Sequence, residues 1–196
     1  MKTAFFDVDT QLDFVCLAGA LYTPGADALT SALAKLTKHA GTQRIPLLST
    51  TDAHSEDDPE FNQWPPHCVA GTFGQQKLGV TLLDKRYVLT TVPGALDRAA
   101  ASGSQQVIIE KQHVDCFTNP NLTELLALID ADRYVVYGVV TDVCVFHAAH
   151  GLLQMGKSVE IVRDAICAST EAAGDNALNR LTGAGATLTS VADVSR

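Results

Sequence analysis

The sequence predicts an α/β protein with three layers, in which helices cover both faces of a central, mostly parallel β-sheet. Short apolar runs rich in β-branched residues alternate with amphipathic helical patterns along the 196 residues. The runs are continuously apolar, which is typical of strands buried on both faces of a parallel sheet. We detect no internal repeat, linker or low-complexity segment, so residues 1–196 are expected to form one domain.

In the first half of the chain, apolar content predicts strands at Thr3–Val8 and Ile45–Ser49. The segment Ala26–His39 carries three leucines at helical spacing, and a glycine shortly after it provides a stop signal. A loop is expected from Asp13 to Gly25, and a long polar one at Thr51–Gly74. A polar loop of that length inside a compact domain is usually functional, and its aromatic residues argue against disorder.

The second half continues the alternation of strand and helix patterns. Strands are expected at Tyr87–Thr91, Gln106–Glu110, Tyr134–Val140, Val159–Val162 and Thr187–Val191, and helices at Gly94–Ala101, Leu122–Ile129, Val143–Leu153 and Thr170–Leu181. Either Thr141 or Asp142 can serve as the N-cap of the helix that begins at Val143.

The charge and the cysteine content restrict the function classes. A net charge of −8 and a pI near 5.1 argue against binding to nucleic acid or to anionic membrane surfaces. No apolar run is long enough to span a bilayer, and the N-terminal segment is typical of a strand and not of a signal peptide. The five cysteines are odd in number and widely scattered, so we expect reduced thiols and a cytoplasmic protein.

Three chemically distinct residues follow predicted strands: Asp9, Lys111 and Cys144. The carboxyl ends of parallel strands meet at one edge of a sheet, so these side chains are expected to lie close together. Cys144 falls in the first turn of a predicted helix, where unpaired N–H groups and the helix dipole favour a thiolate. A carboxylate can take the proton of such a nucleophile and return it to a leaving group, and a nearby ammonium favours the thiolate.

Each of these residues also has an ordinary structural explanation. Most free cysteines are small buried apolar residues, a loop aspartate is often a cap, and a lysine at a strand end is often a solvated charge. His147 lies one turn from Cys144 and is an alternative base, although a histidine on a helix face more often packs or faces solvent. The convergence of an acid, an amine and a thiol at one sheet edge favours an active site.

The long polar loop contains a set of residues that can ligate a metal: Asp52, His54, Glu60 and His67. One carboxylate and two imidazoles, with an optional second carboxylate, suit a divalent transition metal such as zinc, iron or manganese. Two prolines precede His67 and stiffen its backbone. The alternative is a polar loop with solvated side chains, and spacing alone does not separate the two.

In their order along the chain, these motifs resemble those of the isochorismatase-like cysteine hydrolases, and among them the nicotinamidases (pyrazinamidases). The matching stretches are Asp9-Thr10-Gln11-Leu12-Asp13-Phe14, Thr51-Asp52-Ala53-His54 with Trp64-Pro65-Pro66-His67-Cys68-Val69-Ala70-Gly71-Thr72, Lys111 with Phe117, and Gly138-Val139-Val140-Thr141-Asp142-Val143-Cys144-Val145. One such motif would be a weak signal, whereas four in order are specific. Relatives that act on isochorismate or carbamoylsarcosine lack the two metal-loop motifs.

The resemblance implies an activity and a role for each residue. Asp9, Lys111 and Cys144 would form the catalytic triad of an amidohydrolase that converts nicotinamide and water to nicotinate and ammonia through a Cys144 thioester. The peptide between Val139 and Val140 would be cis, a conformation tolerated mainly at functional sites. The N–H groups of Val140 and Cys144 would form the oxyanion hole.

The resemblance also implies a cofactor and a substrate pocket. One divalent transition metal, in the first place zinc with iron or manganese as alternatives, would bind the pyridine nitrogen of the substrate. Its ligands would be Asp52, His54, Glu60 and His67, and the pocket would be lined by Phe14, Trp64 and Phe117. Relatives are often dimers or larger assemblies, so a homo-oligomer is expected as well.

Two features depart from the family pattern. The stretch Val114-Asp115-Cys116 differs from that of many nicotinamidases, so another small amide, imide or ureido compound is an alternative substrate. A non-catalytic ligand-binding relative is a third hypothesis, against which the intact triad argues. Asp7 is an additional acid near the triad, and strand alternation predicts that it points the same way as Asp9.

Overall fold

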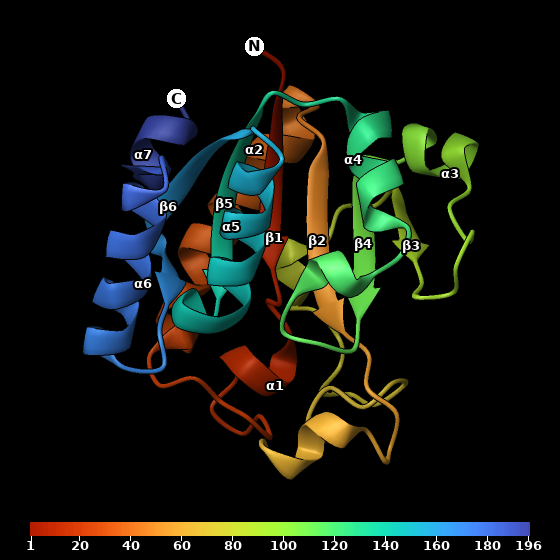
Figure 1. Cartoon of the computed structure of the whole chain (residues 1–196), viewed down its shortest axis with the longest axis vertical. Helices are drawn as coiled ribbons and strands as arrows, with labels where there is room; N and C mark the ends of the chain where they lie inside the picture. Colours follow the sequence, from red (N-terminus) through yellow and green to blue (C-terminus); the bar gives the residue numbers. More distant parts are fainter.

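The computed structural model describes all 196 residues and contains one seven-stranded sheet in which every strand pair is parallel (Figure 1). The strand order is β3-β4-β2-β1-β5-β6-β7. The strands are β1 (Thr3–Val8), β2 (Leu47–Asp52), β3 (Arg86–Leu89), β4 (Gln106–Lys111), β5 (Arg133–Val139), β6 (Ser158–Cys167) and β7 (Thr187–Thr189). The predicted α/β architecture with a parallel sheet is confirmed.

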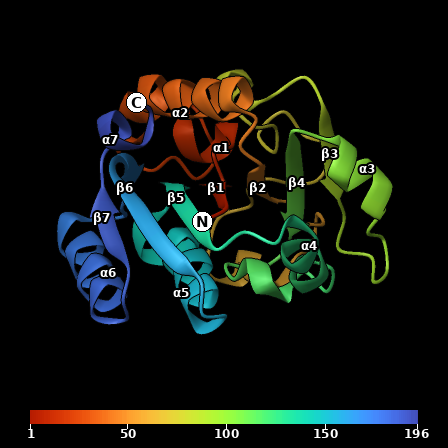
Figure 2. The ribbon, with the colours of Figure 1, turned by 90° about the horizontal axis from the view of Figure 1, so that it is seen from above.

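Helices cover both faces of this sheet (Figure 2). One face carries α2 (Thr30–Gln43) and α7 (Val191–Val194), and the other carries α3 (Arg98–Gly103), α4 (Leu122–Ile129), α5 (Phe146–Gln154) and α6 (Glu171–Gly183). A further short helix, α1 (Leu12–Val15), lies beyond the end of β1. None of these helices is both long enough and apolar enough to cross a bilayer.

Alternation along β1 divides the core between the two faces. Phe6 belongs to a cluster of 26 buried residues under α3 to α6, whereas Phe5 belongs to a cluster of 10 under α2 and α7. Burying one phenylalanine side chain stabilises the fold by about 2 kcal/mol. A register shift of one residue would send both rings to the wrong face, so these contacts specify the position of β1 in the sheet.

The order in which strands are added reverses at β1, in the centre of the sheet. The chain places β2, β3 and β4 on one side of β1 and then returns to place β5, β6 and β7 on the other. Ligand sites in such sheets lie beyond the carboxyl ends of the strands at this switch point. Asp9 follows β1, Asp52 and Lys111 end β2 and β4, and Cys144 follows β5, so the fold brings these four residues to one edge.

Several strand boundaries differ from the prediction. The strand predicted at Ile45–Ser49 is β2 at Leu47–Asp52, so it runs into the stretch predicted as a polar loop, and β3, β4 and β5 differ at their ends by one or two residues. Two further boundaries have a clear physical cause. β6 continues to Cys167, well past the predicted end at Val162, because it keeps pairing with β5 beyond a register shift. The last strand ends at Thr189 and not at Val191, because Ser190 caps α7. Tertiary pairing or a cap decides both boundaries, and the apolar pattern along the sequence does not report either.

The helices differ in similar ways. The helix predicted at Gly94–Ala101 lies at Arg98–Gly103, where the Asp97 carboxylate caps its first turn. The helix predicted to end at His39 begins with a 3₁₀ turn and continues as α2 to Gln43. The first loop, predicted to be irregular throughout, contains α1.

Asp7 is buried on the face of the sheet opposite to the site. Its carboxylate forms an ion pair of 2.9 Å with Lys77 and accepts a hydrogen bond from the Ser49 hydroxyl. Asp9 instead contacts Thr50, the neighbour of Ser49 on β2, whose side chain points to the other face. The prediction that Asp7 and Asp9 point the same way is therefore wrong. Asp9 lies past the end of β1 with a φ of 48°, so strand alternation no longer applies to it.

We expect Lys77→Met to lower the free energy of unfolding by about 3 kcal/mol, because it leaves the Asp7 carboxylate buried without its partner. Urea unfolding followed by circular dichroism measures the change. Arg98→Met is the matched control, since it breaks an exposed ion pair with Glu124 and should cost less than about 1 kcal/mol. Equal effects of the two substitutions would contradict this account of the buried pair.

Candidate active site

The turn that carries Cys144 lies between β5 and α5. The peptide Val139–Val140 is cis, as predicted, and Thr141–Val145 form a π-helical turn before α5 begins at Phe146. Cys144 therefore lies in a π turn and not in the first turn of an α-helix. A π turn widens the helical backbone by one residue and is frequent at functional sites.

Gly138 brings this turn against the end of β1. It has a φ of 118°, and a Cβ at this position would lie 2.1 Å from the carbonyl oxygen of Val8. Only glycine combines that backbone conformation with so close an approach. The contact places the turn after β5 beside Asp9, the residue that follows Val8.

Asp9, Lys111 and Cys144 meet in one buried group, the nucleophile cluster. The Lys111 Nζ lies 2.9 Å from a carboxylate oxygen of Asp9 and 3.6 Å from the Cys144 Sγ. The same ammonium contacts Oδ1 of Asp52. The structure thus brings the three predicted residues together, and their catalytic roles remain a prediction.

Burial controls the protonation of this cluster. It raises the pKa of the Cys144 thiol well above its usual value, and the ammonium of Lys111 offsets only part of this effect. Burial therefore favours the thiol, whereas the end of the helix and the Lys111 ammonium favour the thiolate. Burial also raises the pKa of Asp9, against the opposing effect of Lys111. A thiol beside a carboxylate of raised pKa suits proton transfer between the two.

Thr50 orients the Asp9 carboxylate. Its hydroxyl donates a hydrogen bond of 2.6 Å to Oδ1 of Asp9, and the Asp9 N–H donates back to the same hydroxyl at 3.2 Å. Lys111 pairs with the other oxygen, Oδ2. The sequence analysis missed Thr50, because a threonine inside a strand gives no signal of its own in a single sequence.

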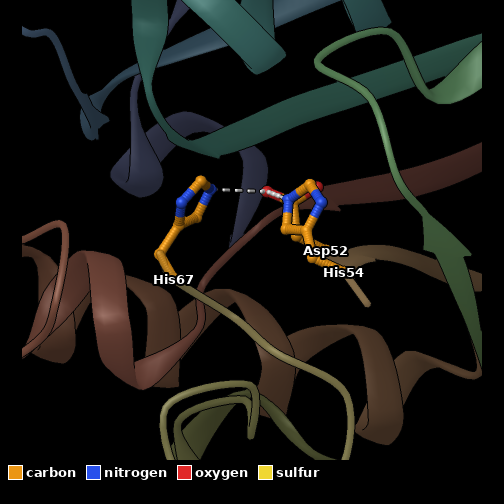
Figure 3. Close-up of side chains that lie close together, drawn as sticks. All are labelled: Asp52, His54 and His67. Carbon is orange, nitrogen blue, oxygen red and sulfur yellow. Dashed lines mark ion pairs between the residues drawn. The ribbon is translucent and has the colours of Figure 1, made fainter. Parts of the chain in front are cut away.

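A second buried group, the histidine cluster, consists of Asp52, His54 and His67. One ligand atom of each lies within 4.8 Å of the other two. Oδ2 of Asp52 lies 3.9 Å from Nε2 of His54 and 4.0 Å from Nε2 of His67. Figure 3 shows the His67 imidazole facing the Asp52 carboxylate, with His54 beside it. Three of the four residues predicted as metal ligands are therefore gathered at one point.

The second nitrogen of each imidazole has a partner that orients the ring. Nδ1 of His54 hydrogen-bonds to the Asp58 carboxylate at 2.9 Å, and Nδ1 of His67 to the carbonyl oxygen of Pro65 at 2.8 Å. Such partners are the usual outer support of metal-bound histidines. Nε2 of His54 is buried without a hydrogen-bond partner, which is unfavourable for a polar atom. The donor set therefore fits a divalent transition metal.

Asp52 connects the two clusters, since one of its oxygens contacts Lys111 and the other faces the imidazoles. Burial alone would raise the pKa of Asp52, but Lys111 and His54 outweigh it and lower the pKa. Burial alone would lower the pKa of His54, yet Asp52 and Asp58 raise it to about 9. The lowered pKa of Asp52 and the raised pKa of His54 both indicate that the carboxylates of Asp52 and Asp58 favour a positive charge beside them.

Two polar side chains that follow β1 hold the loop after β2 in place. Gln11 accepts a hydrogen bond of 2.7 Å from the Asp52 N–H and donates one of 2.9 Å to the Asp52 carbonyl oxygen. Asp13 accepts hydrogen bonds from the N–H groups of Cys68 at 2.7 Å and Ala20 at 2.9 Å. Cys68 has a φ of 46°, so its backbone needs such support. Both residues stand in the recognised N-terminal motif, but these functions became visible only in the structure.

A cavity of about 150 Å³ opens onto both clusters. Phe14 and Trp64 line it, as predicted, and so do Val140 and Cys144, the residues predicted for the oxyanion hole. Other lining residues come from the loop after α1, from the stretch after β4 and from the loop after β6: Leu21, Tyr22, Thr23, Pro24, Val114 and Ser169. More than half of the lining residues are apolar, and Asp52, His67 and Cys144 of the two clusters are among the others.

Three predicted or alternative site residues do not have the contacts that their predicted roles require. Phe117 does not line the cavity, because the 3₁₀ turn after Asp115 directs its ring onto α5, where a Cβ on Gly151 would lie 2.1 Å from it. Glu60 lines the cavity from a 3₁₀ turn but stays outside the histidine cluster, so its predicted role as a ligand is not supported. His147, the alternative base, packs its ring against Phe146 and does not line the cavity.

Comparison with protein families gives a match over nearly the whole chain. The family described as the isochorismatase domain matches residues 3–193. The chain belongs to the isochorismatase family. This isochorismatase-family protein is 27% identical to the nicotinamidase/pyrazinamidase of Mycobacterium tuberculosis over 174 residues, which cover 82% of this chain and 84% of that protein.

Solved structures of similar proteins share the fold. The pyrazinamidase/nicotinamidase of Streptococcus mutans matches with a TM-score of 0.80 and 27% identity, covering 96% of this chain and 100% of that one. A pyrazinamidase of Pyrococcus horikoshii, solved in complex with zinc, matches with a TM-score of 0.81 and 24% identity, covering 97% and 99%. With the family match, these likenesses identify this isochorismatase-family protein as a hydrolase that cleaves amides.

We expect Thr50→Val to slow amide hydrolysis by about tenfold or more and to move the acid limb of its pH profile to higher pH. The hydroxyl stabilises the charged carboxylate, so its removal raises the pKa of Asp9 further and leaves less base at low pH. Ammonia release measured as kcat/KM against pH tests both effects. Thr50→Ser keeps the hydroxyl and should keep the wild-type profile, whereas an unchanged profile in Thr50→Val would contradict the role of Thr50.

Proposed function

We propose that this hydrolase converts nicotinamide and water to nicotinate and ammonia, and that it uses a divalent metal to hold the substrate. The observation that carries the proposal is the position of the two clusters on one small cavity. The nucleophile cluster supplies groups for cleaving an amide, and the histidine cluster supplies donors for a metal. The names of the relatives from Mycobacterium tuberculosis and Streptococcus mutans support this substrate.

The histidine cluster is proposed to hold one metal ion through Asp52, His54 and His67. Zinc is the first choice, because imidazole nitrogens and a carboxylate oxygen are its usual donors, and iron or manganese are alternatives. The bound ion would supply an orienting bond to the pyridine nitrogen of the substrate. The zinc complex of the Pyrococcus horikoshii protein and the unpartnered nitrogen of His54 support this assignment.

The first half of the reaction forms a thioester. Asp9 takes the proton of the Cys144 thiol while the sulfur attacks the carboxamide carbon, and the N–H groups of Val140 and Cys144 are proposed to bind the oxyanion. Asp9 then returns the proton to the amide nitrogen, the C–N bond breaks and ammonia leaves. Lys111 keeps Asp9 in position and stabilises the negative charge that develops on the sulfur.

The second half of the reaction releases the acid. Asp9 takes a proton from water while the water oxygen attacks the thioester carbon. The C–S bond breaks, Cys144 recovers its proton from Asp9, and nicotinate leaves. Burial raises the pKa of both Asp9 and Cys144, and this supports a proton that passes back and forth between them.

The cavity walls support a flat aromatic substrate. Phe14 and Trp64 contribute aromatic side chains to the lining, and Val140 and Val143 contribute apolar ones next to Cys144 in the chain. In this proposal a six-membered ring lies in the cavity and its carboxamide carbon lies at Cys144. The ring nitrogen then points toward the histidine cluster in this proposal.

A second candidate is hydrolysis of another small amide, imide or ureido compound by the same nucleophile cluster. Val114 favours this candidate, because it lines the cavity and belongs to the stretch that departs from the nicotinamidase pattern. Ammonia release across an amide panel, with and without a chelator, separates the two candidates. Absence of turnover with every amide, together with no reaction of Cys144 with an electrophilic nicotinamide analogue, would instead indicate a non-catalytic binding protein.

The proposal also includes a cellular setting. All five cysteines are free thiols, which supports a cytoplasmic enzyme acting on a small molecule. A homo-oligomer remains a prediction from the family resemblance.

We expect Cys144→Ala to reduce ammonia release from nicotinamide by roughly 10⁴-fold or more, because the nucleophile is lost. Its thermal unfolding should stay close to wild type, since only one buried sulfur is removed. A coupled ammonia assay and a melting curve measure the two properties. Cys16→Ala, which changes a partly exposed thiol outside the cluster, is the control and should keep full activity. Retained activity in Cys144→Ala would end the proposed mechanism.

We expect His54→Ala to lose a stoichiometric divalent metal that the wild-type protein retains through dialysis, because it removes one of three donors. Elemental analysis of both proteins gives the metal content directly, independent of activity. His150→Ala, on α5 and outside the cluster, should keep the metal. Equal metal content in His54→Ala and wild type would show that the ion binds somewhere else.

A further inference from the structure

A third buried polar group, the far-face group, consists of Asp7, Thr10 and Lys77. The ion pair of 2.9 Å between Asp7 and Lys77 is at its centre, and both side chains are almost completely buried. The Thr10 hydroxyl donates to the Asp7 carboxylate at 3.0 Å and accepts from the Lys77 ammonium at 2.8 Å. None of the three residues lines the substrate cavity, so the far-face group has no direct contact with the substrate.

Stability alone is a weak explanation for the buried ion pair of this group. The cost of taking two charges out of water offsets most of their attraction, so two apolar side chains of similar volume often stabilise a fold as well. A carboxylate and an ammonium differ from apolar side chains in that they fix the direction of the groups that hydrogen-bond to them. The residues that hydrogen-bond to the pair therefore indicate what it holds in place.

Asp7 holds the chain neighbours of two residues of the nucleophile site. Thr10 directly follows Asp9 in the chain. Ser49, whose hydroxyl donates to Asp7 at 3.3 Å, directly precedes Thr50. Thr50 and Asp9 in turn form the hydrogen bond of 2.6 Å that orients the Asp9 carboxylate. One carboxylate on the far face thus holds the two backbone segments whose next residues meet at the site.

The backbone of Asp9 requires such a restraint. Its φ of 48° lies in the left-handed region, which is unfavourable for residues other than glycine and persists where the surroundings determine it. The main chain after Asp9 is also held, because the Thr10 carbonyl oxygen accepts from the Leu78 N–H at 2.9 Å. Lys77 precedes Leu78 and pairs with Gln11 in an antiparallel bridge. The ion pair of Lys77 is therefore the side-chain part of an attachment that fixes the chain immediately after Asp9.

We propose that Asp7 and Lys77 are positioning residues for the reaction, and that they act through the Thr10 hydroxyl to keep the Asp9 carboxylate beside Cys144. This inference rests on the proposed function, in which Asp9 carries the proton. The far-face group contacts no reacting atom. Its loss should therefore slow the chemical step and leave substrate binding nearly unchanged.

Thr10→Val tests the connecting hydroxyl, since it keeps the size of the side chain and both charges of the ion pair. We expect kcat for amide hydrolysis to fall by about tenfold or more and KM to change by less than about threefold, because a displaced Asp9 affects proton transfer and not binding. Thr10→Ser keeps the hydroxyl and should keep kcat close to wild type. Leu125→Ala, which removes a buried side chain of α4 outside the group, is the control for lost stability and should keep the wild-type kcat.

A double variant separates positioning from stability. Asp7→Leu combined with Lys77→Met removes both charges, so its urea midpoint should lie above that of Lys77→Met alone. Its kcat should be as low as that of Thr10→Val, because the Thr10 hydroxyl has lost both partners. Recovery of kcat together with stability would show that the pair serves only the fold. If the double variant does not fold, the comparison of Thr10→Val with Thr10→Ser decides the question, and equal kcat values would overturn the inference.

Asp9→Asn distinguishes a failure of this inference from a failure of the proposed function. Wild-type activity in Asp9→Asn would end the proposed mechanism and the positioning role with it. An inactive Asp9→Asn together with a wild-type kcat in Thr10→Val would keep the mechanism and refute the positioning role.

Alkylation of Cys144 by iodoacetamide gives the comparison without turnover. Mass spectrometry of the peptide that contains Cys144 measures the rate. Thr10→Val should slow the alkylation, because Asp9 is no longer in place to take the thiol proton. A rate equal to that of the wild type would refute the positioning role whether or not any amide is hydrolysed.

Discussion

The buried ammonium of Lys111 is the charge on which the site depends. Taking a charge out of water costs several kcal/mol unless opposite charges surround it. Asp9 and Asp52 provide those charges, the first from beyond the end of β1 and the second from the end of β2. In the absence of the ammonium, two buried carboxylates this close would repel each other. The parallel sheet brings the strand ends together, and the ammonium keeps the acids side by side.

Asp52 makes the nucleophile cluster and the histidine cluster one electrostatic unit. One of its oxygens contacts the Lys111 ammonium and the other faces the two imidazoles, so rotating the carboxylate toward one side weakens its contact with the other. Gln11 limits such movement, because it holds both the N–H and the carbonyl of Asp52. A change of charge at the imidazoles therefore changes the electrostatic potential at Lys111, Asp9 and Cys144, because these buried groups lie close together and are weakly screened.

A feature could be predicted from the sequence when it depends on a pattern within one short segment, and could not when it depends on contacts between distant segments. Continuous apolar runs such as Thr3–Val8 mark buried parallel strands, and the residues at their ends are then brought together by topology alone. The direction of Phe117 depends on a 3₁₀ turn and a nearby glycine on α5, and no local pattern reports either. Thr50 and Asp7 make contacts that depend on the face of the sheet on which each side chain lies, and on which residues the fold brings to that face.

The π turn at Cys144 is a further case of this kind. Its residues have ordinary helical spacing, so a single sequence predicts an α-helix. The structure shows the wider turn, for example in the hydrogen bond from the Val145 N–H to the Val140 carbonyl, five residues apart. The effect of burial on the Cys144 thiol, which raises its pKa against the neighbouring ammonium, is likewise a tertiary property that the sequence does not report.

One carboxylate, Asp13, supports two loops at once through the N–H groups of Ala20 and Cys68. The first loop continues into a wall of the substrate cavity at Leu21, and the second carries His67. Neither loop can be lengthened, shortened or grafted from another protein without disturbing the anchorage of the other. In engineering terms, the cavity wall at Leu21 and the segment that carries His67 would have to be exchanged together.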